Sequence, residues 1–160
     1  MKKRLLCWAD SPMVTTGYGQ VCRYLLQALQ AIGNWDIDVL AINHDGNFYD
    51  QEKYPYQLIP AKFLDPNDVY GCKMFLRAIK QKEYDAILII NDTFVVHPVA
   101  EPLQQYLKEK NLKTKVFFYF PVDCQLRPDF AGMIKTAHYP VTMTNWAKQK
   151  TIGELPELEN

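Results

Sequence analysis

Charge of one sign, pairable cysteines and long apolar runs are scarce in this chain. Basic and acidic residues number 18 each among 160, so the balance gives no reason to expect nucleic acid or an anionic membrane as a partner. The four cysteines lack the short spacings of a zinc site or a redox motif, and we interpret them as buried, reduced thiols. No apolar run approaches the roughly 20 residues that cross a bilayer. We therefore expect a soluble, cytoplasmic protein without a transmembrane segment.

Several catalytic arrangements are also missing. The sequence has only three histidines, and it shows no Ser-His-Asp order, no cluster of metal ligands and no Walker loop. The basic start runs into an apolar stretch that ends at Asp10, which is too short for a signal peptide. The residues therefore predict neither a metal nor a cofactor, and they name no protein nucleophile.

Alternating strand and helix patterns fill the rest of the chain. We expect strands at residues 5–9, 35–42, 56–60, 85–90, 116–120 and 139–143. Helices are expected over 21–32, from the turn at 65–68, from Pro98 or Pro102 to Asn111, over 129–137 and from Trp146. The runs at 86–90 and 116–120 are apolar throughout, as in central parallel strands. This order predicts one domain over residues 1–160, an α/β fold with a doubly wound, Rossmann-like parallel sheet.

The connection after the first strand is the most informative local feature. It reads Ser11 to Thr16 and then Gly17-Tyr18-Gly19, directly before the first helical pattern. Two glycines one residue apart let the backbone turn sharply, and they leave N–H groups uncovered where a helix start can receive a phosphate. The third glycine of the dinucleotide fingerprint is absent. A tight turn without a ligand is the alternative interpretation.

Polar residues just after the strands are the other candidates, because ligands of doubly wound sheets bind beyond the carboxyl ends of the strands. Asp92 and His97 could bind sugar hydroxyls or share a proton, or Asp92 could cap a turn and His97 merely precede a helix. Asp123 follows the second central strand, and solvation in a loop is its alternative role. Arg127 could pair with Asp123 or with a ligand anion. Asn145 follows the last predicted strand.

The ordered set of post-strand motifs resembles the N-terminal domain of retaining GT-B glycosyltransferases of the group 1 type. The resemblance rests on four segments and spans nearly the whole chain. They are Gly17-Tyr18-Gly19-Gln20-Val21-Cys22-Arg23-Tyr24, Tyr84-Asp85-Ala86-Ile87-Leu88, Tyr119-Phe120-Pro121-Val122-Asp123 and Val141-Thr142-Met143-Thr144-Asn145-Trp146-Ala147-Lys148.

The resemblance implies the N-terminal, acceptor-side half of a GT-B architecture, with the C-terminal donor domain absent from these residues. The whole enzyme would move a sugar from a nucleotide-diphosphate-sugar, its substrate, to a carbohydrate, lipid or protein acceptor with retention, and without another cofactor. Backbone N–H groups at Gly17, Tyr18 and Gly19 would stabilise the departing diphosphate. Asp92, His97 and Asp123 would orient hydroxyls. Many relatives carry a histidine near Asp123, so only a contact role transfers to that residue.

Two other functions remain open. One is a non-catalytic, flavodoxin-like domain that binds a nucleotide or a sugar. The other is a partial Rossmann oxidoreductase, which the missing third glycine disfavours, as does the lack of a clear acidic residue at the end of the second strand, although Asp45 lies nearby.

Overall fold

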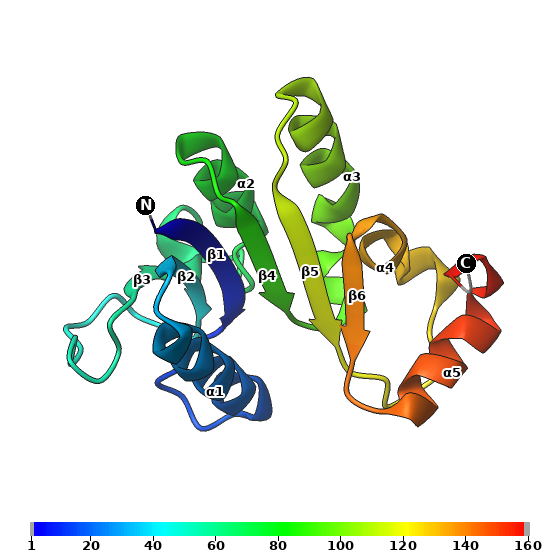
Figure 1. Cartoon of the computed structure of the whole chain (residues 1–160), viewed down its shortest axis with the longest axis horizontal. Coiled ribbons are helices and arrows are strands. Elements are labelled where there is room, and N and C mark those ends of the chain that lie inside the picture. The colour runs from blue at the N-terminus through cyan, green and yellow to red at the C-terminus, as the bar shows by residue number, and fades with distance from the viewer. Residues whose placement is uncertain (1, 159–160) are drawn as a thin grey trace.

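The computed structural model describes residues 2–158, which form a six-stranded, all-parallel sheet flanked by helices (Figure 1). The doubly wound α/β fold expected from the sequence is confirmed. The strand order is β3-β2-β1-β4-β5-β6. The strands are β1 (Lys3–Asp10), β2 (Trp35–Ile42), β3 (Gln57–Pro60), β4 (Ala86–Ile90), β5 (Lys115–Phe120) and β6 (Tyr139–Thr142). The helices are α1 (Gly17–Ile32), α2 (Cys72–Gln81), α3 (Thr93–Glu109), α4 (Gly132–Thr136) and α5 (Asn145–Glu154).

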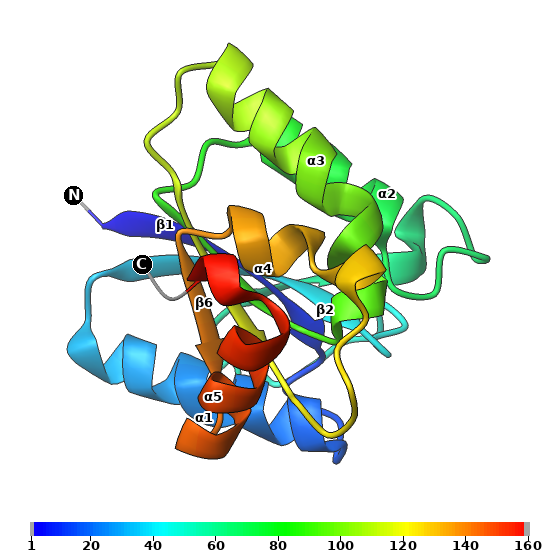
Figure 2. The ribbon, with the colours of Figure 1, turned by 90° about the vertical axis from the view of Figure 1, so that its right-hand side faces the viewer.

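One face of the sheet is covered by α2, α3 and α4. Alternate residues of the central strands point to this face, and they pack with the helices into the larger core. The Trp8 ring stacks on Phe75 of α2 with 4.5 Å between ring centroids. Figure 2 shows α2 and α3 on the side of the sheet opposite α1. The helices on this face explain half of the apolar pattern of β4 and β5, since the residues of these strands that point toward α2, α3 and α4 are buried.

The other face carries α1. Its buried residues Cys22 and Leu26 pack against Leu5, Cys7 and the neighbouring strands. The loop between β2 and β3 adds Tyr54 and Tyr56 to the same cluster. Among the described helices, α1 is the one that contributes buried side chains to this face.

The predicted start of the third helix is wrong. α3 begins at Thr93, before both prolines, and holds Pro98 and Pro102 inside it. A proline inside a helix costs about 3 kcal/mol. However, α3 buries six apolar residues, and each such side chain contributes roughly 1.5–3 kcal/mol when it is fully buried. Both prolines are exposed, so the helix continues through them on its solvent side.

The predicted start of the second helix is wrong as well. The turn at residues 65–68 does not open α2, which begins at Cys72 after Gly71 in the left-handed conformation with φ of 78°. The Asp68 carboxylate accepts hydrogen bonds from the Cys72 and Lys73 N–H groups at 3.0 and 2.7 Å. It therefore satisfies the first turn of a helix that starts four residues later.

The strand order admits two descriptions. All six strands follow the order of dinucleotide-binding Rossmann folds. β3 has four residues and lies at the edge, and without it the other five strands follow the flavodoxin order. The order therefore does not choose between the two folds named from the sequence. In both descriptions the chain reverses direction across the sheet at β1 and β4, whose carboxyl ends meet where ligands of such sheets bind.

Candidate functional site

The two glycines after β1 lie inside the first turn of α1 rather than in a sharp turn. Neither has a positive φ. The Thr16 side chain caps the helix, and its oxygen accepts the Gly19 N–H at 3.0 Å. The same hydroxyl donates to Asp10 at the end of β1. The Gly19 N–H is therefore already paired, and an acid already lies at this helix start. The glycine segment is therefore not the open turn that the sequence predicted, and its contact with a phosphate stays a prediction.

Gly19 serves close packing. A Cβ atom built on it would lie 2.8 Å from the Val14 carbonyl oxygen and 2.9 Å from the Ser11 carbonyl oxygen. A Cβ on Gly17 would meet nothing within 4 Å. The two glycines therefore differ in their surroundings. Gly19 allows the helix to contact the preceding loop, whereas Gly17 faces open space.

Arg23 holds that loop in place. Its guanidinium donates to the Pro12 carbonyl oxygen at 2.6 Å and to the Val14 carbonyl oxygen at 3.1 Å. Sequence reasoning assigned no role to Arg23. The sequence signal for this role is the spacing of four residues between Gly19 and Arg23. Residues four apart lie on the same face of a helix, so the Arg23 side chain lies on the side of α1 that touches the loop.

Tyr18 joins the glycine segment to the end of β4. Its hydroxyl donates to an Asp92 carboxylate oxygen at 2.6 Å. Burial, this hydrogen bond, and the charges of Asp92, Asp123 and Asp10 raise the pKa of Tyr18 well above its usual value. The phenol therefore stays protonated at neutral pH and acts as a donor. Asp92 occupies the N-cap position of α3, yet its side chain makes no capping bond. Its carboxylate is directed to Tyr18 instead.

A pocket of about 320 Å³ opens beside this pair. Asp92, Asp123 and Arg127 line it, as do the aromatic rings of Phe94 and Phe130. Arg127 pairs with Asp129 at 3.3 Å, not with Asp123, and its guanidinium lies 4.6 Å from the Phe130 ring centroid. Three of the residues singled out from the sequence thus line one pocket.

Two other candidates lie elsewhere. His97 is exposed on α3, with its ring centroid 5.7 Å from that of Phe130 and its edge against Gly132. It packs behind the pocket and does not line it. Asn145 begins α5 after the capping Thr144, and it lines a separate hollow of about 520 Å³ between β6 and α5.

The edge of the sheet around the pocket is acidic. Asp10, Asp92 and Asp123 all contribute to the raised pKa of Tyr18, so their negative charges act on one place. Arg127 also lines the pocket, and its positive charge is paired with Asp129. Because like charges repel, the three carboxylates disfavour a diphosphate, whereas neutral hydroxyl groups can donate hydrogen bonds to them. Within residues 2–158, no group of three or more acidic, cysteine or histidine residues is arranged to hold a metal ion.

The cysteines are only partly as expected. Cys7 and Cys22 are buried with their sulfur atoms 3.9 Å apart, whereas Cys72 is half-buried and Cys124 is exposed. The prediction that all four are buried is therefore wrong. A hydrogen bond to Asp123, followed by desolvation and nearby negative charge, raises the pKa of Cys124. Cys124 is consequently a poor nucleophile despite its place beside the pocket.

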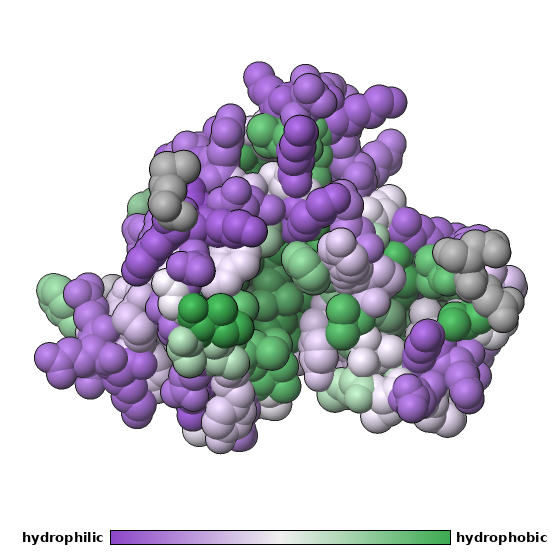
Figure 3. All heavy atoms as spheres, viewed as in Figure 1, coloured by the Kyte–Doolittle hydropathy of each residue, from purple (hydrophilic) through white to green (hydrophobic). Residues whose placement is uncertain are grey.

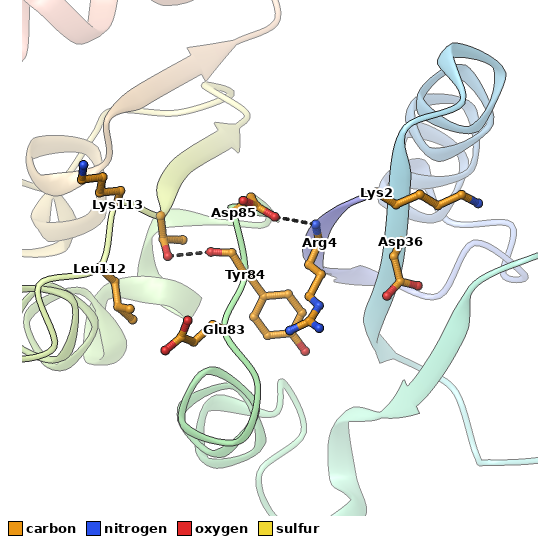
Figure 4. Close-up of a pocket in the computed structure, with 9 residues that line it drawn as sticks. Lys2, Arg4, Asp36, Glu83, Tyr84, Asp85, Leu112 and Lys113 are labelled. Carbon is orange, nitrogen blue, oxygen red and sulfur yellow. Dashed lines mark hydrogen bonds between the residues drawn. The ribbon is translucent and has the colours of Figure 1, made fainter.

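A second polar hollow, of about 580 Å³, lies at the opposite edge of the sheet (Figure 4). Its polar groups hold the strand starts together. The Arg4 N–H donates to Asp85 at 2.7 Å, and the Thr114 hydroxyl donates to the Tyr84 carbonyl oxygen at 2.6 Å. These internal pairings make the hollow a structural part of the fold, distant from the glycine segment.

Comparisons with known proteins concern the fold alone. No family model matches the chain, and no curated protein matches it. A LuxR-family DNA-binding response regulator from Staphylococcus aureus is 11% identical with a TM-score of 0.46, and 99% of each chain is covered. The signal receiver domain of the putative response regulator NarL from Mycobacterium tuberculosis is 12% identical with a TM-score of 0.43, with 99% of this chain and 98% of that chain covered. A dTDP-glucose 4,6-dehydratase from Bacillus anthracis is 10% identical with a TM-score of 0.44, with 98% of this chain and 49% of that chain covered.

None of the described helices is long and apolar enough to span a membrane.

Proposed function

We propose that the carboxyl edge of the sheet binds a neutral, hydroxyl-rich ligand of the sugar class, as the acceptor-side domain of a retaining glycosyltransferase. The observation that carries this proposal is the Tyr18–Asp92 hydrogen bond beside the pocket that Asp92 and Asp123 line. The bond joins Tyr18, which lies in the glycine segment that carries the family resemblance, to Asp92, which follows β4 at the carboxyl edge of the sheet. The negative charge around the pocket favours hydroxyl groups over phosphate.

Each lining group has a chemical role in this proposal. The Asp92 and Asp123 carboxylates accept hydrogen bonds from ligand hydroxyls. Phe94 and Phe130 offer apolar faces on which the C–H side of a sugar ring packs. Tyr18 stays protonated and holds Asp92 in one orientation. In this role the chain orients an acceptor, which requires no nucleophile from the chain itself.

In this proposal the glycine segment offers fewer free N–H groups to a diphosphate than the sequence predicted. The first-turn N–H groups of Gly17 and Tyr18 remain at the helix start, but Gly19 is bonded to Thr16 and Asp10 lies next to the cap. A donor nucleotide-sugar would therefore depend mainly on groups outside these residues for its phosphates.

A non-catalytic sugar-binding domain is the second candidate. Tyrosine and cysteine side chains ordinarily titrate above pH 7, and the pKa values of Tyr18 and Cys124 are raised further, so neither side chain supplies an ionised nucleophile or base at neutral pH. A binding domain needs no such group. The reading frame beyond Asn160 separates the candidates, since a second array of alternating strands and helices is expected of a glycosyltransferase.

The binding proposal is tested with Asp92→Asn and Asp123→Asn. Calorimetric titration of a panel of methyl hexosides should find binding by the wild-type chain that weakens at least tenfold in each variant, since a hydrogen bond to a charged group contributes about 1.5–3 kcal/mol. Glu101→Gln, at an exposed position of α3, is the control and should bind as the wild type does. Equal binding by all four proteins would contradict the proposal.

A further inference from the structure

An apolar groove of about 380 Å³ lies on the face of the sheet that carries α1. Leu25 and Leu29 of α1, together with Trp35, form one side, and Leu88, Phe117 and Val141 of β4, β5 and β6 line the rest. Figure 3 shows hydrophobic surface through the middle of the molecule, between the parts that Figure 1 draws as α1 and β6. No residue in the described part of the chain lines both this groove and the polar pocket at the carboxyl edge.

The groove is where this face of the sheet is left without a helix. On the opposite face, Ile87, Ile89 and Phe118 are at most 1% exposed beneath α2, α3 and α4. On the groove face, Leu88, Phe117 and Tyr119 of the same two strands are only partly buried. Parallel sheets are ordinarily covered on both faces, so an apolar layer is missing over β4 and β5.

The two ends of the groove differ in charge. Residues two apart on a strand share a face, so Lys3 lies on the face of Leu5, and Lys115 lies on the face of Phe117. The Lys3 ammonium is also 6.0 Å from the Trp35 ring centroid at the groove wall. At the carboxyl end of the strands, Tyr18 packs against the apolar cluster of this face, and its hydroxyl is bonded to the Asp92 carboxylate. The groove thus runs from a basic end to an acidic end.

We propose that this groove docks an amphipathic helix of a partner protein, which runs antiparallel to the strands. A helix about 10 Å across fills the space of one missing layer element. In that orientation its positive N-terminal end lies at the acidic end of the groove, and its negative C-terminal end lies near Lys3 and Lys115. The apolar walls and the charge at both ends therefore select the same occupant and the same direction. The docking does not depend on sugar binding.

The experiment uses two labelled synthetic helical peptides with the same leucine stripe. One carries lysines in its first turn and glutamates in its last. The other carries glutamates in both turns, so that it cannot match the charges at both ends of the groove in either direction. Fluorescence anisotropy with the 160-residue chain should show the first peptide binding at least fivefold more tightly than the second. Equal affinities would overturn the proposal.

Substitutions in the chain locate the binding surface. Leu25→Glu and Val141→Glu place a charge at groove positions that are 37% and 41% exposed, and each should weaken the first peptide at least tenfold. Tyr24→Glu changes the neighbouring position on α1, which is 62% exposed and does not line the groove, and it should leave the affinity unchanged. Equal weakening by Tyr24→Glu would overturn the assignment to the groove.

Sedimentation of the chain without peptide tests the competing occupant. The proposal expects a monomer for the wild type and for Leu25→Glu. A dimer that Leu25→Glu converts to monomer would show that a second copy of the chain fills the groove, which would overturn the partner helix.

Discussion

Gly17 and Gly19 share one helical turn but face different surroundings. A methyl group on Gly17 enters open space, whereas on Gly19 it would meet two carbonyl oxygens of the preceding loop at 2.8 and 2.9 Å. Gly19 therefore serves the packing of the loop first.

The first prediction compares Gly19→Ala with Gly17→Ala. Overpacking against a backbone costs about 1–3 kcal/mol, so Gly19→Ala should lower the free energy of unfolding by an amount in this range. Gly17→Ala should leave it unchanged or raise it by up to about 1 kcal/mol, because alanine is the better helix former. Urea denaturation measures both. Equal stability of the two variants would contradict the packing seen at Gly19.

Tyr18 gives a prediction about alkaline pH. Its pKa is raised in the folded chain, so its stabilising contribution is present in full below the pKa of an unfolded tyrosine, about 10, and is lost as the pH rises above that value. Above this pH, the free energy of unfolding should fall more steeply for the wild type than for Tyr18→Phe. Tyr24→Phe, an exposed position on the same helix, is the control and should keep the wild-type slope. Identical slopes for all three proteins would mean that the Tyr18–Asp92 bond does not form in solution.

At the scale of elements, α3 shows what local patterns leave out. Pro98 and Pro102 are good local signals for a helix start, yet the helix begins at Thr93 because Val95 and Val96 pack into the core. That packing depends on strands far away in the sequence. The strands were easier to predict, since continuous apolar runs mark β4 and β5 without reference to any partner.

The candidate site was likewise predictable only in part. Position after a strand identified Asp92 and Asp123, because the carboxyl ends of parallel strands share one edge. The direction of each side chain was not predictable. Arg127 turns to Asp129, His97 packs behind the pocket, and Asn145 belongs to another hollow. The Tyr18–Asp92 bond spans 74 residues, and no local pattern could signal it.

The third prediction concerns the interior prolines of α3. Pro98→Ala restores a backbone donor in an exposed part of the helix, so the free energy of unfolding should rise by about 1–3 kcal/mol. Glu101→Ala lies on the same helix, and it should change stability by less than about 0.5 kcal/mol. Thermal or urea unfolding compares the two. A destabilised Pro98→Ala would show that the prolines stabilise α3 in a way that helix propensity does not describe.

At the scale of the whole molecule, topology and charge act together. The order of the strands brings the ends of β1 and β4 side by side, and the first turn of α1 places Tyr18 against Asp92. Lys3 and Lys115 lie at the starts of β1 and β5. Asp36, Glu83 and Asp85 also line the hollow at that edge, and Asp10, Asp92 and Asp123 lie together at the opposite edge. A chain with no net charge thus carries a locally negative carboxyl edge, which is the basis of the proposed preference for a neutral polyol over a phosphate.

The most direct measurement of this claim is a pair of titrations followed by the backbone amide NMR signals of the 160-residue chain. Methyl hexosides should cause saturable shifts at Tyr18, Asp92 and Asp123, whereas inorganic pyrophosphate should cause none at Gly17 and Tyr18. Saturable pyrophosphate shifts at the start of α1, together with no response to any hexoside, would contradict the proposed function and restore the anion-binding interpretation of the glycine segment.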